Sequence, residues 1–186
     1  MTKRETANKN RVVYLYPWWN DKFARRLNRP CMATTMGGKA EADECGFATS
    51  STGIAVAGGH GYATTDSGIA IAAYYTEHGV AAAGIGGTAI SGELGISKAS
   101  HDGMAISRYR GQSRAGRGGI VAAGEMGALS LEYHDGERCR FAIGYIGEDG
   151  LRPNVPYRLN DKHEFVVAED IDIRKVIQDV VNVAYA

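Results

Sequence analysis

Glycine recurs about every eight residues through the middle of this sequence, and the repeat restricts the possible folds more than any other feature. Thirteen units run from position 31 to 134, and twelve of them begin with Gly. Nine units have Ala at the third position, and twelve have Ala, Ser or Thr at the fifth. A unit this short cannot bury an apolar face alone, so it must stack on copies of itself.

Each unit reads as a short strand followed by a turn. Four or five residues alternate in character, and about three more, often Gly, Asp or Ser, follow them. Two units give a coil of about 16 residues with two strands facing each other, and each strand pairs in parallel with its equivalent about 4.8 Å away. We therefore predict an all-β fold, a two-sided β-solenoid (β-helix) of about six and a half coils.

The size of the side chains predicts which positions point inward. The third and fifth positions are almost uniformly small, as at Ala55 and Ala57, which suits a thin interior. The second and fourth positions range from Ile to Arg and are expected to point outward. The last unit has Leu129 and Leu131 at the inward positions, which predicts a wider interior that meets a cap.

The flanking segments are expected to cap the two ends of the solenoid, because an open coil exposes unpaired strand edges. Residues 1–30 would form a basic N-terminal cap, 31–134 the solenoid and 135–186 a small α/β C-terminal cap. Within this last segment the pattern predicts a strand at 138–146, then a hairpin and a final helix. The hairpin would pair 157–159 with 165–168, and the helix would occupy 170–186.

The outward positions of the even-numbered units form two ladders of aliphatic side chains. A sheet face of that size would exceed the few hundred Å² that soluble monomers leave exposed, so either a cap or a second copy must cover it. Because the flanks must also close both ends, we predict a homodimer through this face. The predicted self-association residues are Ile54, Val56, Ile69, Ile71, Ile90, Met104, Ile106 and Ile120.

One unit, beginning at Gly68, has eleven residues, so its turn is enlarged by three. Loops on a rigid scaffold often carry function, and paired tyrosines suit contact surfaces. The alternative is a tolerated insertion. The predicted partner-binding loop contains Tyr74, Tyr75, Glu77 and His78.

The charge balance argues against a nucleic-acid-binding polycation, because 21 Lys and Arg are matched by 21 Asp and Glu. Residues 1–30 are nevertheless basic, with eight Lys or Arg against two acidic residues. This segment reads either as an amphipathic cap or as a contact surface. Late in the repeat, two cations fall at the fourth position of odd units and should be neighbours, forming either a solvated surface or an anion-binding patch. The candidate anion or partner contacts are Trp18, Trp19, Arg25, Arg26, Lys98 and Arg114.

No catalytic, cofactor or metal site is expected. No GxGxxG motif occurs, and Lys39 is followed by Ala40, where a phosphate-binding loop needs Ser or Thr. His60 and His78 end units on the same side of successive coils, so stacking could bring them close, but such residues are usually solvated corners.

The cysteines and the hydropathy pattern predict a compartment. Cys31, Cys45 and Cys139 lack the CxxC spacing of a zinc site and are odd in number, which favours a reducing environment. No stretch approaches 18 consecutive apolar residues, and the N-terminus lacks the apolar core of a signal peptide. We therefore expect a cytoplasmic protein without a membrane span.

The repeat resembles the 16-residue coil of bacterial ice-nucleation proteins, in which two octads of the form GSTxTAGx alternate. The resemblance covers residues 31–134 and is one of architecture, because the outward threonines stand singly rather than in pairs. These threonines are Thr34, Thr49, Thr64 and Thr88. The repeat with its tail is also similar to small octad-repeat proteins of phages and mobile elements, which implies an inhibitor or decoy acting on a host protein such as a defence system.

These observations predict a non-enzymatic interaction protein that self-associates and binds a protein partner. Two alternatives remain at this point. One is an ice-binding or surface-template protein, and the other is a protein that contacts nucleic acid through the basic N-terminus.

Overall fold

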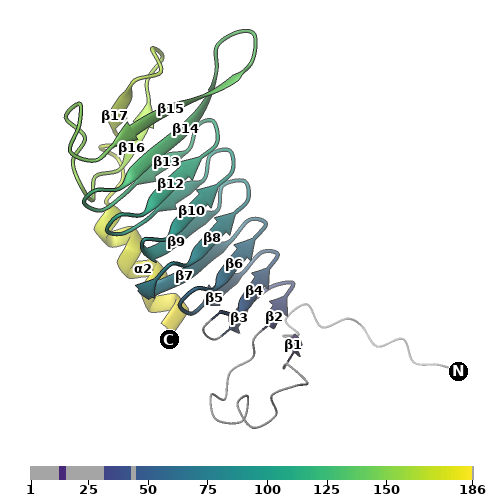
Figure 1. Cartoon of the computed structure of the whole chain (residues 1–186). Coiled ribbons are helices and arrows are strands. Elements are labelled where there is room, and N and C mark those ends of the chain that lie inside the picture. The colour runs from purple at the N-terminus through teal and green to yellow at the C-terminus, as the bar shows by residue number, and fades with distance from the viewer. Residues whose placement is uncertain (1–12, 16–31, 43–44, 186) are drawn as a thin grey trace, which may run out of the picture.

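The chain winds into a β-solenoid of about six turns, with a helix at its C-terminal end (Figure 1). The computed structural model describes residues 13–15, 32–42 and 45–185. Among these residues no helix is long and apolar enough to cross a membrane. The prediction of an all-β solenoid is confirmed.

The strands form two sheets, and each unit of the repeat contributes to the sheet opposite its neighbours. We call them sheet A and sheet B. Sheet A contains, in order, β1 (Val13–Leu15), β2 (Met32–Thr35), β4 (Phe47–Ser50), β6 (Tyr62–Thr65), β8 (Val80–Ala83), β10 (Ile96–Ala99), β12 (Gln112–Ala115), β14 (Ala128–His134) and β15 (Cys139–Tyr145). Sheet B contains β3 (Lys39–Ala42), β5 (Ile54–Ala57), β7 (Ile69–Glu77), β9 (Thr88–Glu93), β11 (Met104–Ile106), β13 (Ile120–Ala122), β16 (Tyr157–Leu159) and β17 (Phe165–Val167).

The coils stack in register along both sheets, apart from a shift within β7. In sheet A, Ile96 pairs with Gln112 and Gln112 with Ala128, so equivalent residues lie 16 apart. The first coils are one residue shorter, because Met32 pairs with Phe47 and Phe47 with Tyr62. Glycine at the corner permits this stacking. A Cβ atom on Gly53 would lie 1.9 Å from the carbonyl oxygen of Gly38 in the preceding coil.

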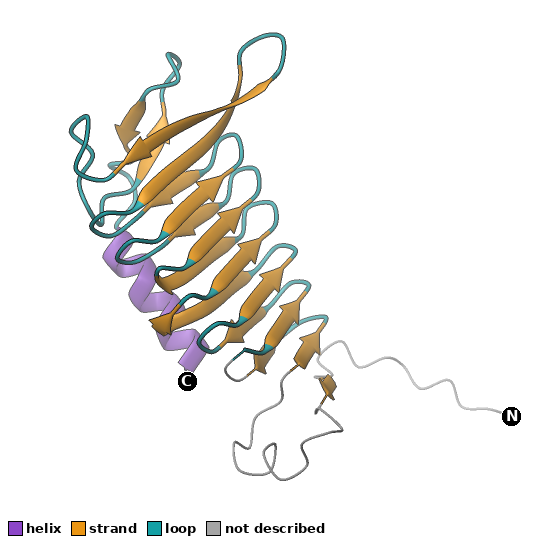
Figure 2. Cartoon of the chain, viewed as in Figure 1, coloured by secondary structure: helices purple, strands orange, loops and turns teal. Residues whose placement is uncertain are grey.

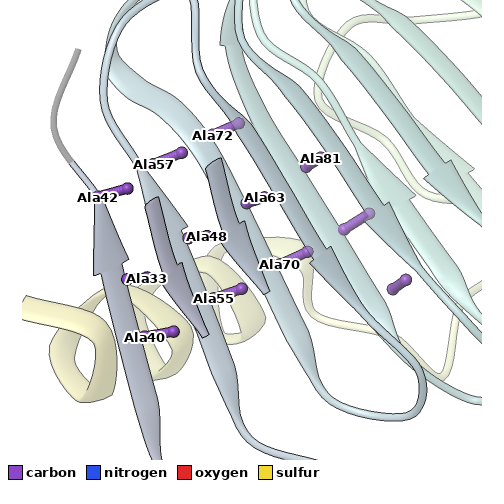
Figure 3. Close-up of a cluster of buried hydrophobic side chains, with 12 residues drawn as sticks. Ala33, Ala40, Ala42, Ala48, Ala55, Ala57, Ala63, Ala70, Ala72 and Ala81 are labelled. Atoms are coloured by element: carbon purple, nitrogen blue, oxygen red, sulfur yellow. The ribbon is translucent and has the colours of Figure 1, made fainter. Parts of the chain in front are cut away.

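Alanine side chains make up most of the interior over the first coils (Figure 3), together with Thr35, Ser50 and Thr65 at the buried fifth positions of sheet A. They point inward from both sheets at the third and fifth positions of the units, as predicted. Strands only a thin layer apart leave no room for larger side chains, which explains the uniform small residues. The cluster comprises Ala33, Ala40, Ala42, Ala48, Ala55, Ala57, Ala63, Ala70, Ala72, Ala81, Ala83 and Ala89.

Buried serines replace alanine in the later coils and pair across the interior. The Ser113 hydroxyl donates to the carbonyl oxygen of Ala122 at 2.6 Å and is hydrogen-bonded to the Ser107 hydroxyl at 2.8 Å. Ser97 and Ser91 form the same pair one coil earlier, also at 2.8 Å. Each hydroxyl therefore has a partner in an otherwise apolar interior, which a buried polar group requires.

We expect Ser113→Ala to lower the free energy of unfolding by about 1–2 kcal/mol, because it leaves the buried Ser107 hydroxyl without its partner. Alanine fits the position sterically, since Ala33, Ala48 and Ala63 occupy equivalent positions on earlier strands. The double variant Ser107→Ala, Ser113→Ala removes both hydroxyls and should recover most of the loss. Urea unfolding curves of the three proteins test this. A double variant much less stable than the single one would contradict the pairing.

The C-terminal end closes the tube with larger side chains. Leu129 and Leu131, on the inward side of β14, are buried with Leu151 and Tyr157 from the tail. Strand β15 returns antiparallel to β14, and the hairpin β16–β17 continues sheet B. The predicted strand and hairpin are confirmed, and the two leucines are buried against the tail as expected.

The final helix, α2 (Ile173–Tyr185), packs across the outer face of sheet B (Figure 2). Asp172 caps its N-terminus, and its Oδ1 atom accepts hydrogen bonds from the backbone N–H groups of Arg174 at 3.0 Å and Lys175 at 3.2 Å. The buried side chains of the helix are Ile173, Val180 and Ala184. They meet the fourth-position residues of sheet B, which are Val56, Ile71, Ile90, Ile106 and Ala122.

This helix corrects the expectation that a second copy covers the apolar face of sheet B. Ile71 and Ile90 are fully buried, and Val56 and Ile106 are nearly so, within a single chain. The second-position residues Ile54, Ile69 and Met104 are partly buried against the same cluster, and Ile120 is half-buried. An amphipathic helix of the same chain supplies the apolar cover that was expected from a second copy, so this face gives no argument for a homodimer.

Candidate protein-binding face

The outer face of sheet A carries two rows of side chains, with one residue of each row from every strand between β2 and β15. The alternation of each strand sends every second residue outward, and the register aligns them. The first row is Met32, Phe47, Tyr62, Val80, Ile96, Gln112, Ala128 and Tyr145. The second is Thr34, Thr49, Thr64, Ala82, Lys98, Arg114, Ser130 and Ile143. We call this surface the sheet A face.

The N-terminal half of the sheet A face is aromatic and exposed. The rings of Phe47 and Tyr62 are stacked with centroids 5.1 Å apart and planes at 7°. Their side chains are nevertheless 47% and 45% exposed, and Met32 beside them is 37% exposed. Thr34, Thr49 and Thr64 run alongside in register, as single threonines rather than pairs. A rigid apolar row with a polar row beside it is typical of contact surfaces between proteins.

The C-terminal half of the sheet A face carries two cations, and Glu132 of β14 lines the same hollow as both of them. Lys98 and Arg114 are paired in register on β10 and β12, so the prediction that they are neighbours is confirmed. The guanidinium of Arg114 lies over the ring of Phe141, 4.0 Å from its centroid, which fixes the side chain against the sheet. Within the described ranges neither cation forms an ion pair. Their role as contacts for an anion or a partner remains a prediction.

A shallow groove of about 450 Å³ lies beside these two cations. Ile96 and Gln112 line it from the solenoid, and Ile143 and Tyr145 line it from β15. Phe141, Ile143 and Tyr145 were not predicted to lie here, because they follow the repeat. The alternating apolar residues of the tail indicated a strand. These residues reach the sheet A face because that strand pairs antiparallel with β14.

The enlarged unit forms a bulge inside a strand rather than a turn at a corner. Ala72 pairs with Ser91 and Glu77 with Glu93, so the extra residues arch out of β7 while the strand continues. The arch lies close over Gly92, where a Cβ atom would come within 1.8 Å of the carbonyl oxygen of Ala73. The prediction of a projecting loop is therefore corrected to a strand bulge.

The two tyrosines of this bulge have different surroundings. Tyr74 packs against the apolar cluster under α2, and Arg108 donates a hydrogen bond to its carbonyl oxygen at 3.1 Å. Burial raises the pKa of the Tyr74 hydroxyl. Tyr75 meets Tyr74 edge to face at 4.8 Å and is 68% exposed. Tyr74 thus supports the fold, whereas Tyr75 remains on the surface as a partner-contact candidate.

The two histidines that stacking could bring close, His60 and His78, lie together at one corner of the solenoid. The rings of His60 and His78 stack with centroids 5.2 Å apart, and His78 Nδ1 lies 3.6 Å from the carboxylate of Glu77. Both histidines hold a left-handed backbone conformation, as do equivalent corner residues of other coils. In the described part of the chain no three His, Cys, Asp or Glu residues are placed to hold a metal ion.

The remaining candidates cannot be placed. Trp18, Trp19, Arg25 and Arg26 lie outside the described residues. Strand β1 is described, and it pairs antiparallel with β2 at the start of sheet A.

Comparison with known proteins found a similarity over one segment of the chain. A stretch of 46 residues, 25% of this chain, is 50% identical to the Escherichia coli (strain K12) protein named "Uncharacterized protein YdhT". The match spans 17% of that protein's length. No protein family and no solved structure matches the chain.

Proposed function

We propose that this chain is a non-enzymatic interaction scaffold that binds a partner protein through the sheet A face. The observation that carries the proposal is the contrast between the two outer faces. The apolar face of sheet B is covered by α2, whereas the sheet A face keeps Phe47 and Tyr62 about half exposed. Exposed aromatic side chains on a rigid surface are the usual anchors of protein interfaces.

The charges of the sheet A face favour an acidic partner. Lys98 and Arg114 stand side by side without an ion pair in the described structure, and Arg114 is held in place by Phe141. A carboxylate from the partner would complete this arrangement, and the groove beside it offers apolar contact with Ile143 and Tyr145. The partner surface would therefore present acidic and apolar groups together.

The repeat resembles small octad-repeat proteins of phages and mobile elements. That resemblance favours a host protein, such as a component of a defence system, which the chain would inhibit or sequester. A cytoplasmic location fits this role.

Affinity capture from a lysate of the source organism tests the proposal. The tagged protein is compared with Tyr62→Ser and Arg114→Glu, and with Val183→Ser as a control, because Val183 is 58% exposed on the outer side of α2. Removal of an aromatic anchor at an interface commonly costs about 2 kcal/mol or more, which corresponds to about a thirtyfold loss of affinity. We expect both face variants to lose one specific protein and the control to retain it.

Two outcomes would contradict the proposal. One is a captured protein that both face variants retain. The other is capture that nuclease treatment abolishes for every variant, which would favour nucleic-acid contact through the basic N-terminus instead. Circular dichroism of each variant shows that the fold is intact.

A further inference from the structure

Strand β15 ends sheet A with a free edge. It is seven residues long, and within the part of the chain that the structure describes its one partner strand is β14. On its other side, among the described residues, only the carbonyl oxygen of Tyr145 accepts a backbone hydrogen bond, from Glu148. A long strand edge with unpaired N–H and C=O groups is a template for another strand.

The side chains of β15 favour pairing of this edge with another strand. Phe141, Ile143 and Tyr145 point to the outer side and are 39%, 62% and 53% exposed. On the inner side a Cβ atom at Gly144 would lie 2.5 Å from Leu151, so the cap fixes that surface. The strand has no Pro and no Lys, the residues that usually protect an edge.

The one charge on the strand is already compensated. Arg140 forms an ion pair with Asp135 at the hairpin tip. The backbone N–H groups of Arg138 and Glu137 also donate to Asp135, each at 2.9 Å. The hydrogen bond from the Arg138 backbone, followed by that from Arg140, holds the pKa of Asp135 well below its ordinary value. The hairpin is thereby fixed, and β15 presents its edge without free charge.

We propose that β15 pairs antiparallel with β15 of a second copy, about a two-fold axis at Ala142. In this register Phe141 faces Ile143 of the second copy, Cys139 faces Tyr145, and Arg140 faces Gly144. Aromatic and β-branched residues form stabilising cross-strand pairs, and no like charges are opposed. The edge is therefore complementary to itself, as a two-fold interface requires. Sheet A becomes continuous through two solenoids joined at their C-terminal ends.

This homodimer uses a different surface from the one predicted on sheet B. It shares Ile143 and Tyr145 with the groove of the sheet A face, but its hydrogen bonds would come from the edge of β15, so it does not rest on the proposed partner binding. Pairing would place the grooves beside Lys98 and Arg114 of the two copies on one extended sheet.

Sedimentation equilibrium at micromolar concentrations tests the dimer, with Ile143→Lys as the disrupting variant. Ile85→Lys is the matched control, because Ile85 is 67% exposed at a corner far from β15. We expect the wild type and Ile85→Lys to be dimers and Ile143→Lys to be a monomer with an unchanged circular dichroism spectrum. A monomeric wild type would overturn the inference, as would a dimer that survives Ile143→Lys.

Disulfide trapping tests the register. In a Cys31→Ser, Cys45→Ser background, Tyr145→Cys would face Cys139 of the second copy at a Cα separation of about 4.5–5.5 Å, within disulfide range. We expect a covalent dimer after oxidation, and none when Cys139→Ser is added. If the covalent dimer fails to form, or forms equally without Cys139, the register is wrong. Failure here leaves the partner proposal standing, since Tyr62→Ser tests that at the other end of sheet A.

Discussion

Ile71→Asp is expected to destabilise the protein by about 4 kcal/mol or more, the largest effect of any single change proposed. Ile71 is fully buried between sheet B and α2, in register with Val56 and Ile90. The substitution removes apolar contacts that are usually worth about 2–5 kcal/mol and places a carboxylate where it finds no partner. Thermal and urea unfolding measure the loss.

The matched control is Ile85→Asp, since Ile85 is exposed and should tolerate the charge. The result also distinguishes the two explanations for the burial of the outer face of sheet B, which are cover by α2 and cover by a second copy. If a second copy covered it, Ile71→Asp would dissociate a dimer and leave each subunit folded. A folded Ile71→Asp protein with unchanged stability would show that α2 does not cover this position.

The second large effect is expected for Ala89→Leu. Ala89 is fully buried and lies in register between Ala70 and Ala105, which are also fully buried. Overpacking a core commonly costs about 1–3 kcal/mol, and with neighbours fixed in both adjacent coils we expect the upper end of this range. The loss is measured as a lower melting temperature and urea midpoint.

Thr88→Leu provides the comparison, because Thr88 is the adjacent residue but points outward and is half-buried. It should change stability little by this mechanism. A larger loss for Thr88→Leu than for Ala89→Leu would mean that the inward and outward positions are exchanged.

The repeat was sufficient to predict the solenoid because one physical constraint acts on every coil. The two sheets lie so close together that inward positions accept only small side chains, such as those of Ala55 and Ala57. At the corners the backbone of one coil lies against that of the preceding coil, which requires glycine, as at Gly53. The same constraint predicted the widening at Leu129 and Leu131. Their large side chains fit only where the tail supplies a cap.

The cover of sheet B could not be predicted in the same way. The apolar spacing of Ile173, Val176 and Val180 predicted the helix correctly, but spacing does not specify which surface a helix packs on. A second copy would have buried the fourth-position residues equally well. The choice depends on the path of the chain after β17, which returns α2 along the solenoid (Figure 1).

The candidate binding face, too, could be predicted only where it lies within the repeat. Lys98 and Arg114 were predicted to be neighbours because the octad period sets their spacing. Phe141, which holds Arg114, comes from outside the repeat, so no period connects the two residues. The burial of Tyr74 was missed for a similar reason, since a bulge and a corner loop have the same number of extra residues.

Site-specific photo-crosslinking tests the proposed function most directly. A photoreactive phenylalanine analogue replaces Tyr62 on the sheet A face or, in a second protein, Val183 on α2, two positions of similar exposure on opposite sides of the molecule. After irradiation in a lysate of the source organism, the proposed binding face predicts one specific crosslinked protein from position 62 and none from position 183. Crosslinking to the same protein from position 183 alone, or equally from both, would contradict it.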